Sequence, residues 1–265
     1  MILNLIIKSP ILDERLPGVW KPKRIFMKFM DQLNFSKKLY LLLAIPVFAL
    51  AIYTMIAFYS TYVNVTKYSA LKELSALSVK ISNVIHETQK ERGLSAGFVS
   101  SHGKKFKEQL AQQRKLTDRQ INALSDFLNH LSLESTVPEF EQKLEKALDK
   151  VSSLQTIRKS VDNLGMTSVE MITLYSSMNA SLLDTIATIV KMADNVKTSN
   201  EINGYLNFLQ AKERMGIERA VGTGTLTRGG FSEGMRAYFI ELIAQQEAFL
   251  KNFYYYAPER ALKAY

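Results

Sequence analysis

One stretch of the chain, residues 39–66, contains no charged side chain. Its first part, residues 39–58, is predominantly apolar. At about 1.5 Å per helical residue, this part is long enough to cross a hydrocarbon core of about 30 Å. Tyr59 and Tyr62 follow at the place where an interfacial aromatic belt would lie. The sequence therefore predicts a transmembrane helix over residues 39–62.

The segment before this helix is basic and predicts the orientation in the membrane. Residues 1–38 contain the basic side chains Lys8, Arg15, Lys21, Lys23, Arg24, Lys28, Lys37 and Lys38 against the acidic Asp13, Glu14 and Asp31. An excess of Lys and Arg stays on the cytoplasmic side of a bacterial cell membrane, so we expect a cytoplasmic leader and a periplasmic or extracellular domain after the helix. The sequence Ala49-Leu50-Ala51 has the form of a signal-peptidase site, but the basic leader is too long for a signal peptide. An uncleaved anchor is favoured.

Composition excludes several classes of function. The formal net charge is +9, but much of the basic excess lies in the leader, so a nucleic-acid partner has little support. Cysteine is absent and the three histidines are far apart, which argues against metal ligands and cofactors. The sequence contains no nucleophile–base pair, phosphate-binding glycine loop or carboxylate cluster with metal-ligand spacing. We therefore expect a protein that is not an enzyme and has neither cofactor nor metal.

After Lys67 the apolar side chains recur at helical spacing, and strict alternation typical of strands is missing. Breaks or helix starts are predicted at Ser101-His102-Gly103, Pro138, Gly165, the capping boxes Thr167-x-x-Glu170 and Thr198-x-x-Glu201, Arg228-Gly229-Gly230 and Ser232. The pattern predicts an all-α, up-and-down antiparallel helical bundle over residues 67–256, with two stacked four-helix bundles as an alternative. Residues 257–265 would begin a further C-terminal part. Heptad-like stripes also favour a homodimer.

Two arginines stand in stripes that otherwise point to the core. Arg92 belongs to the series Ile81, Ile85, Thr88, Arg92, Ser95 and Val99, and Arg219 belongs to the series Tyr205, Leu209, Lys212, Gly216, Arg219, Thr223 and Leu226. Both series become polar and rich in small residues around their arginine. The flanking segments are also alike, since Glu91–Gly97 and Glu218–Gly224 share a Glu-Arg pair followed by small residues and glycine. We interpret them as a weak internal repeat.

This repeat predicts two guanidinium groups opposite one another in the bundle core. Two desolvated cations repel unless an anion lies between them, and guanidinium groups match planar oxyanions through paired N–H···O bonds. The predicted ligand is therefore a small planar anion. The alternative is that each arginine forms a salt bridge with Glu87, Glu91, Glu213 or Glu218, and the residues alone leave both interpretations open.

Further site residues are predicted around this pair. Arg114 and Lys212 are additional candidates for contact with the anion, although a solvated surface position for Arg114 and a snorkelling position for Lys212 are simple alternatives. The small residues expected to line the site are Gly93, Ser95, Gly216 and Thr223. Arg214 is expected to point away from the stripe and to lie outside the site.

At these residues the chain resembles the nitrate- and nitrite-sensing (NIT) domain. The matching stretches are Gln89–Gly97, Arg114-x-x-Thr117-Asp118, Lys212-Glu213-x-x-Gly216-x-Glu218-Arg219-Ala220, and the later helix with Gln245-Gln246, Phe249 and Phe253. The resemblance covers about residues 68–256. It implies an all-helical sensor in which arginines at the positions of Arg92 and Arg219 grip nitrate or nitrite between two helices.

The resemblance also implies a receptor that signals across the membrane, in chemotaxis or two-component signalling, with chemoreceptors as the commonest type. The cytoplasmic output module of such receptors is absent from this sequence. The competing hypothesis is a helical dimerisation or interaction module, in which the arginines are structural salt-bridge partners and no small ligand binds.

Overall fold

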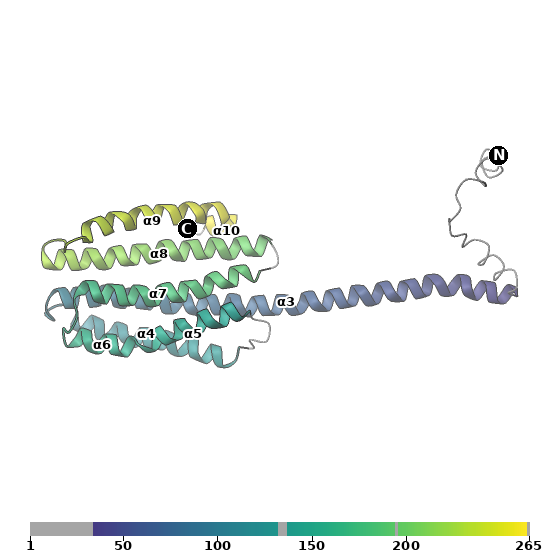
Figure 1. The fold of residues 1–265 in the computed structure, drawn as a ribbon, viewed down its shortest axis with the longest axis horizontal. Helices are drawn as coiled ribbons and strands as arrows, with labels where there is room; N and C mark the ends of the chain where they lie inside the picture. The colour runs from purple at the N-terminus through teal and green to yellow at the C-terminus, as the bar shows by residue number, and fades with distance from the viewer. Residues whose placement is uncertain (1–33, 132–136, 194–195, 264–265) are drawn as a thin grey trace, which may run out of the picture. The chain divides into compact units, whose positions relative to one another are not determined.

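The computed structural model describes residues 34–131, 137–193 and 196–263, and this part of the chain contains helices and no strand. The helices, labelled as in Figure 1, are α3 (Phe35–Ser100), α4 (Lys107–Asn129), α5 (Pro138–Ser152), α6 (Leu154–Asp162), α7 (Ser168–Lys191), α8 (Val196–Arg228), α9 (Met235–Tyr256) and α10 (Glu259–Leu262). The prediction of an all-α bundle is confirmed.

Helix α3 contains the predicted transmembrane segment. Its part Phe35–Val65 has a mean hydropathy of 2.4 and is long and apolar enough to cross a membrane. The predicted span, residues 39–62, lies inside this part. Residues 1–33, most of the predicted leader, lie outside the described residues. The chain divides into two compact units, Met1–Val65 and Thr66–Tyr265, and the second unit is the helical bundle.

In the bundle, helices α3 and α7 each have neighbours in two groups of helices. Helix α7 packs against α5 and α8, and α9 packs against α8. Side chains of α3 form hydrogen bonds with α4, α7 and α8. In Figure 1, α8 and α9 lie on one side of α7, and α4, α5 and α6 lie on the other. The bundle therefore consists of two sets of helices that share α3 and α7.

The core follows the apolar stripes of these shared helices. On α3 the buried positions include the whole predicted series, Ile81, Ile85, Thr88, Arg92, Ser95 and Val99. On α7 they include Met171, Tyr175, Met178, Leu182, Ile186 and Ile189. Each fully buried aliphatic side chain contributes about 1.5–3 kcal/mol relative to an exposed one. This apolar surface fixes the rotation of both helices and so determines where their polar side chains point.

Helix α7 begins with the capping box that the sequence predicts. The Thr167 hydroxyl accepts a hydrogen bond from the backbone N–H of Glu170 at 3.2 Å, and the Glu170 carboxylate accepts one from the Thr167 N–H at 2.8 Å. This reciprocal capping box starts α7 as predicted. It supplies two partners to the unpaired N–H groups at the helix start.

Two other predicted helix starts are wrong. Helix α8 begins at Val196, ahead of the predicted Thr198 cap. Helix α9 begins at Met235, and its N-cap is Gly234 with a positive φ of 74°, not Ser232. The Ser232 hydroxyl instead accepts a hydrogen bond from the Arg228 guanidinium.

Candidate functional site

Arg92 lies in the centre of the bundle, where its side chain is fully buried. Its Nη1 donates to the Ser176 hydroxyl on α7 at 2.8 Å and to Glu213 Oε1 on α8 at 2.5 Å. The Glu213 side chain is only 2% exposed. Arg92 therefore holds a buried ion pair between α3 and α8, and its partner is one of the four glutamates predicted as alternatives.

The other edge of the Arg92 guanidinium has no partner. Within the described part of the chain, Nε and Nη2 are buried and neither donates a hydrogen bond. Leaving a buried charged donor unpaired costs about 1–3 kcal/mol or more, so such groups mark a place where a partner is missing. The N–H groups of Nε and Nη2 point in nearly the same direction and form the fork that accepts planar oxyanions.

A second arginine shows what this fork does when it is occupied. Arg158 on α6 donates from Nε to Glu91 Oε1 at 2.7 Å and from Nη2 to Glu91 Oε2 at 2.8 Å. Its Nη1 donates to Asp118 at 2.6 Å. The Nε–Nη2 edge of Arg158 thus binds one carboxylate side-on while Nη1 binds another. Arg92 has only the Nη1 half of this arrangement.

Gly216 lies directly against the open edge of Arg92. A Cβ atom at Gly216 would lie 2.8 Å from Arg92 Nη2, which is closer than carbon and nitrogen atoms approach. The glycine therefore gives the guanidinium its space on α8. Gly93 has no atom within 4 Å of the position of a Cβ, so open space also lies beside it on α3. Both belong to the predicted set of small residues.

The other two members of that set have different neighbours. Ser95 is fully buried, and its hydroxyl lies close enough to Tyr175 of α7 to influence the pKa of that residue. The Thr223 methyl group lies 3.3 Å from the place of a Cβ on Gly97.

The prediction that Arg219 faces Arg92 in the core is not what the structure shows. Arg219 is exposed and forms no ion pair with the residues that the structure describes. Helix α8 is rotated so that Glu213, Gly216 and Ala220 face inward, because pairing with Arg92 lets the Glu213 carboxylate be buried. This rotation turns position 219 outward.

Lys212 and Arg219 belong to a basic cluster at the surface between α3 and α8. Burial lowers the pKa of His86, and the nearby charges of Lys212, Lys90 and Arg219 lower it further. The Glu87 carboxylate pairs with Lys90 at 3.0 Å and partly offsets these charges. Two of the four predicted anion-binding residues therefore lie together, but outside the core.

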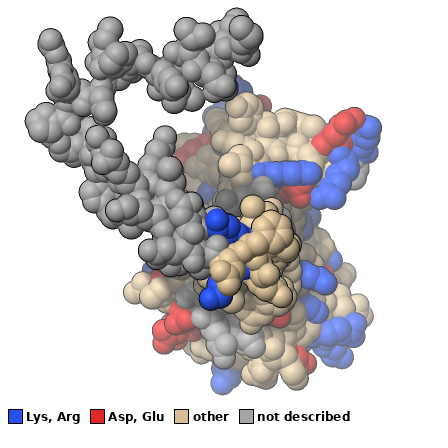
Figure 2. Space-filling view, turned by 90° about the vertical axis from the view of Figure 1, so that its right-hand side faces the viewer, with Lys and Arg blue, Asp and Glu red and all other residues tan. Residues whose placement is uncertain are grey.

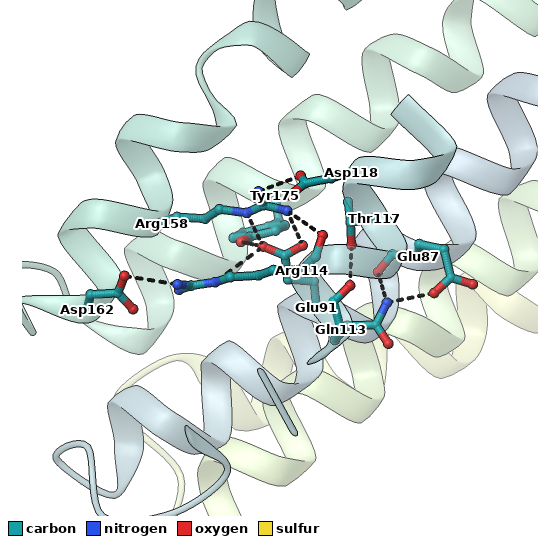
Figure 3. A network of polar contacts seen from close by, with 9 residues as sticks. All are labelled: Glu87, Glu91, Gln113, Arg114, Thr117, Asp118, Arg158, Asp162 and Tyr175. Carbon is teal, nitrogen blue, oxygen red and sulfur yellow. Dashed lines mark hydrogen bonds and ion pairs between the residues drawn. The ribbon is translucent and has the colours of Figure 1, made fainter. Parts of the chain in front are cut away.

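Arg114 lies in a different part of the bundle, in the network drawn in Figure 3. Its Nη1 donates to Asp162 at 2.9 Å, and its Nε lies 3.8 Å from Glu91 Oε1. The structure thus does not bring Arg114 to Arg92. Its side chain is 18% exposed, so the predicted alternative of a solvated surface arginine is also inaccurate.

The residue at the centre of this network was not predicted from the sequence. Arg158 has a side chain that is 5% exposed, and it binds the fully buried Glu91. The Tyr175 hydroxyl also donates to Glu91, at 2.8 Å, and burial together with the Glu91 charge raises the pKa of Tyr175. The sequence does indicate that Arg158 could be buried, since it follows Ile157 within the apolar face of α6. Its partner Glu91 could not be identified, because it lies far away in the sequence.

A cavity of about 500 Å³ lies between α7, α8 and α9. Ser176 and Glu213, which both bind Arg92 Nη1, are among its lining residues. Tyr238 of α9 lines it too, where burial raises the pKa of Tyr238 and the nearby guanidiniums of Arg92 and Arg214 oppose this shift. The cavity therefore reaches the immediate partners of Arg92.

Arg214 was expected outside the site, but it lines this cavity. Its guanidinium lies 4.7 Å from the ring centroid of Phe249 and donates to Gln245 and Gln210. Among the described residues, no group of three or more His, Asp or Glu side chains is placed to hold a metal ion. The chemistry of the site is that of arginine side chains and their oxygen partners.

Comparison with known proteins gives consistent results. The family model for nitrate and nitrite sensing, NIT, matches residues 83–265. The nitrate regulatory protein of Klebsiella oxytoca is 24% identical over 196 residues, which cover 73% of this chain and 49% of that protein. The solved structure of the NasR transcription antiterminator has a TM-score of 0.70 at 22% identity, over 74% of this chain and 53% of that one. The chain thus spans about half the length of either relative.

Proposed function

Since the chain belongs to the nitrate- and nitrite-sensing (NIT) family, we propose that its helical bundle binds nitrate or nitrite at the open edge of Arg92. The observation that carries this proposal is a fully buried guanidinium whose Nε and Nη2 have no partner in the described residues. Nitrate and nitrite are planar and univalent, and two of their oxygens can accept from the two parallel N–H groups. Either anion would complete the arrangement that Glu91 completes on Arg158.

In this proposal, the remaining predicted residues have different tasks. Gly93, Ser95, Gly216 and Thr223 leave room for the anion between α3 and α8. Lys212 and Arg219 attract it from the surface, because clustered cations raise the local concentration of anions. Arg114 belongs to the ion-pair network around Glu91, but its Nε and Nη2 also form no hydrogen bond within the described residues. Arg92 is preferred as the anion site because its side chain is fully buried, whereas that of Arg114 is 18% exposed.

We further propose that the protein is a membrane-anchored receptor. The segment Phe35–Val65 would cross the bacterial cell membrane, the basic leader would remain in the cytoplasm, and the bundle would lie outside it. Figure 2 shows acidic as well as basic side chains on the face turned to the viewer. Mixed charges of this kind attract a nucleic acid less than a uniformly basic face would. Because α3 carries both Phe35–Val65 and Arg92, it would transmit the signal, in chemotaxis or two-component signalling, from a homodimer.

One observation favours the competing function of a helical interaction module. Arg92 is paired with Glu213, as that hypothesis requires. The two hypotheses differ in what the open edge of Arg92 does. A purely structural arginine gains nothing from an anion, whereas a sensor binds one and is stabilised by it.

Isothermal titration of the full chain in phosphatidylcholine nanodiscs tests the proposal. Nitrate, nitrite, sulfate and chloride are compared for the wild type, Arg92→Lys and the control Arg236→Ala, which removes an exposed arginine of α9. Lysine retains the charge opposite Glu213 but lacks the fork. We expect saturable binding of nitrate or nitrite by the wild type and by the control, and a loss of at least about tenfold in affinity for Arg92→Lys. Equal affinity in all three would show that the anion binds away from Arg92, and no binding by any of them would favour the interaction module.

A further inference from the structure

We propose that Glu213 is a built-in counter-ion that restricts the Arg92 site to univalent anions and lowers their affinity. This inference rests on the proposed function of that site. Glu213 would be more than a structural partner of Arg92, because it shares the same guanidinium with the ligand. Its negative charge would then determine how much further negative charge the site accepts.

The Glu213 carboxylate is held in place as a charged group. Oε1 accepts from Arg92 Nη1, and Oε2 accepts from Gln89 Nε2 at 2.7 Å and from Asn179 Nδ2 at 3.1 Å. The Thr88 hydroxyl donates to Asn179 Oδ1 at 2.7 Å, which orients the amide so that its nitrogen faces Glu213. Every one of these groups is buried, so the carboxylate stays beside Arg92 when a ligand arrives.

The protein itself shows that one guanidinium can hold two anions. Arg158 binds Glu91 with its Nε–Nη2 edge and Asp118 with Nη1. Arg92 binds Glu213 with Nη1 and has its Nε–Nη2 edge open. A planar anion at this edge would reproduce the Arg158 arrangement without displacing Glu213.

The carboxylate that binds Nη1 is more exposed on Arg158 than on Arg92, and this difference determines which anions the Arg92 site can bind. Asp118 is 46% exposed, so water screens its charge, whereas Glu213 is 2% exposed. With Glu213 in place, Arg92 is already neutralised, and the incoming anion adds uncompensated charge in a buried place. The guanidinium of Arg214 lies nearby, but it is half-buried and occupied by Gln210 and Gln245. The site therefore binds a univalent anion with reduced affinity and excludes a divalent anion.

The variant Glu213→Gln removes the charge and retains the shape. The matched control is Glu218→Gln on the same helix, since Glu218 accepts from Gln246 and does not contact Arg92. Nitrate, nitrite and sulfate are titrated calorimetrically against the full chain in nanodiscs, with melting temperatures measured in parallel. A second variant, Glu213→Asp, retains the charge but draws the carboxylate back from Arg92, and it decides the question if the glutamine variant does not fold.

We expect Glu213→Gln to bind nitrate or nitrite at least about tenfold more tightly than the wild type and to gain sulfate binding. Glu213→Asp should bind the univalent anion more tightly than the wild type and still exclude sulfate, and Glu218→Gln should match the wild type. If the wild type binds nitrate and the Glu213 variants bind it no better, or if the wild type binds sulfate equally well, Glu213 is only structural. If neither the wild type nor any variant binds an anion, the proposed function itself fails.

Discussion

Glu91 and Arg92 are adjacent on α3, and they are held by adjacent residues of α7. The Tyr175 hydroxyl donates to Glu91 at 2.8 Å, and the Ser176 hydroxyl accepts from Arg92 at 2.8 Å. The acidic residue thus fixes one side of α3 to the Arg158 network, while the basic residue faces Glu213 on the other. The Glu-Arg pair therefore sets the position of α3 along α7 and presents the open edge of Arg92.

Removing the acidic member of this pair should destabilise the bundle strongly. Glu91→Gln leaves Arg158 with only the partly exposed Asp118 as a charged partner. Breaking a buried ion pair from one side costs about 3–5 kcal/mol, so we expect a loss of this size in the free energy of unfolding. Urea unfolding followed by circular dichroism measures it. Glu73→Gln, at an exposed position of α3, is the control, and a loss as small as that of the control would contradict the structural role of Glu91.

Gly216, which faces Arg92, and Gly93, which follows Arg92 in the chain, should respond oppositely to alanine. In Gly216→Ala the new Cβ would lie 2.8 Å from Arg92 Nη2, so we expect a loss of about 1–3 kcal/mol and weaker anion binding. In Gly93→Ala the Cβ meets no atom within 4 Å, and the loss of backbone freedom in the unfolded chain should stabilise by about 0.4–1 kcal/mol. Thermal and urea unfolding of both variants check the signs, and equal effects would exclude the described contact.

The basic cluster predicts that stability falls on mild acidification. Burial and the charges of Lys212, Lys90 and Arg219 lower the pKa of His86 below its ordinary value of 6.5. In the unfolded chain the histidine takes up a proton first, so protons favour unfolding as the pH falls through 6.5 and below. We expect the free energy of unfolding to decrease between pH 8 and pH 5.5, above the range in which ordinary carboxylates titrate. His86→Gln should flatten this slope, and an unchanged slope in that variant would refute the assignment.

Arg219 and Lys212 should influence anion binding through long-range attraction. Both lie at or near the surface, where salt screens charges over about 10 Å at 0.1 M. We expect Arg219→Ala to lower nitrate affinity several-fold at low ionic strength and to have little effect at high ionic strength. Titrations in both buffers measure the difference. A loss that persists in high salt would show instead that Arg219 contacts the ligand, as the family resemblance implies.

The sequence was sufficient to predict most of the fold. The apolar periodicity of α3 correctly placed Ile81, Ile85 and Arg92 on one buried face, because apolar neighbours on both sides fix that face. The Thr167 capping box was recognisable because all its groups lie within four residues. Local signals of this kind depend on no distant partner.

The errors concern charged residues with distant partners. Glu213 looks like a surface residue in the sequence, so the inward face of α8 was assigned through Lys212 and Arg219. The structure buries Glu213 because Arg92 neutralises it, and the two residues are 121 positions apart. Arg158 and Glu91 are 67 positions apart and were missed for the same reason. Periodicity cannot identify a buried charge whose partner lies on another helix.

The Nε–Nη2 edge of Arg92 is the place where we propose that a planar anion binds. A crystal structure of the protein grown with saturating nitrate or nitrite tests this proposal most directly. We expect an anion with two oxygens within hydrogen-bonding distance of Nε and Nη2, with Glu213 still bound to Nη1. An anion bound elsewhere, with this edge of Arg92 still unoccupied, would contradict it.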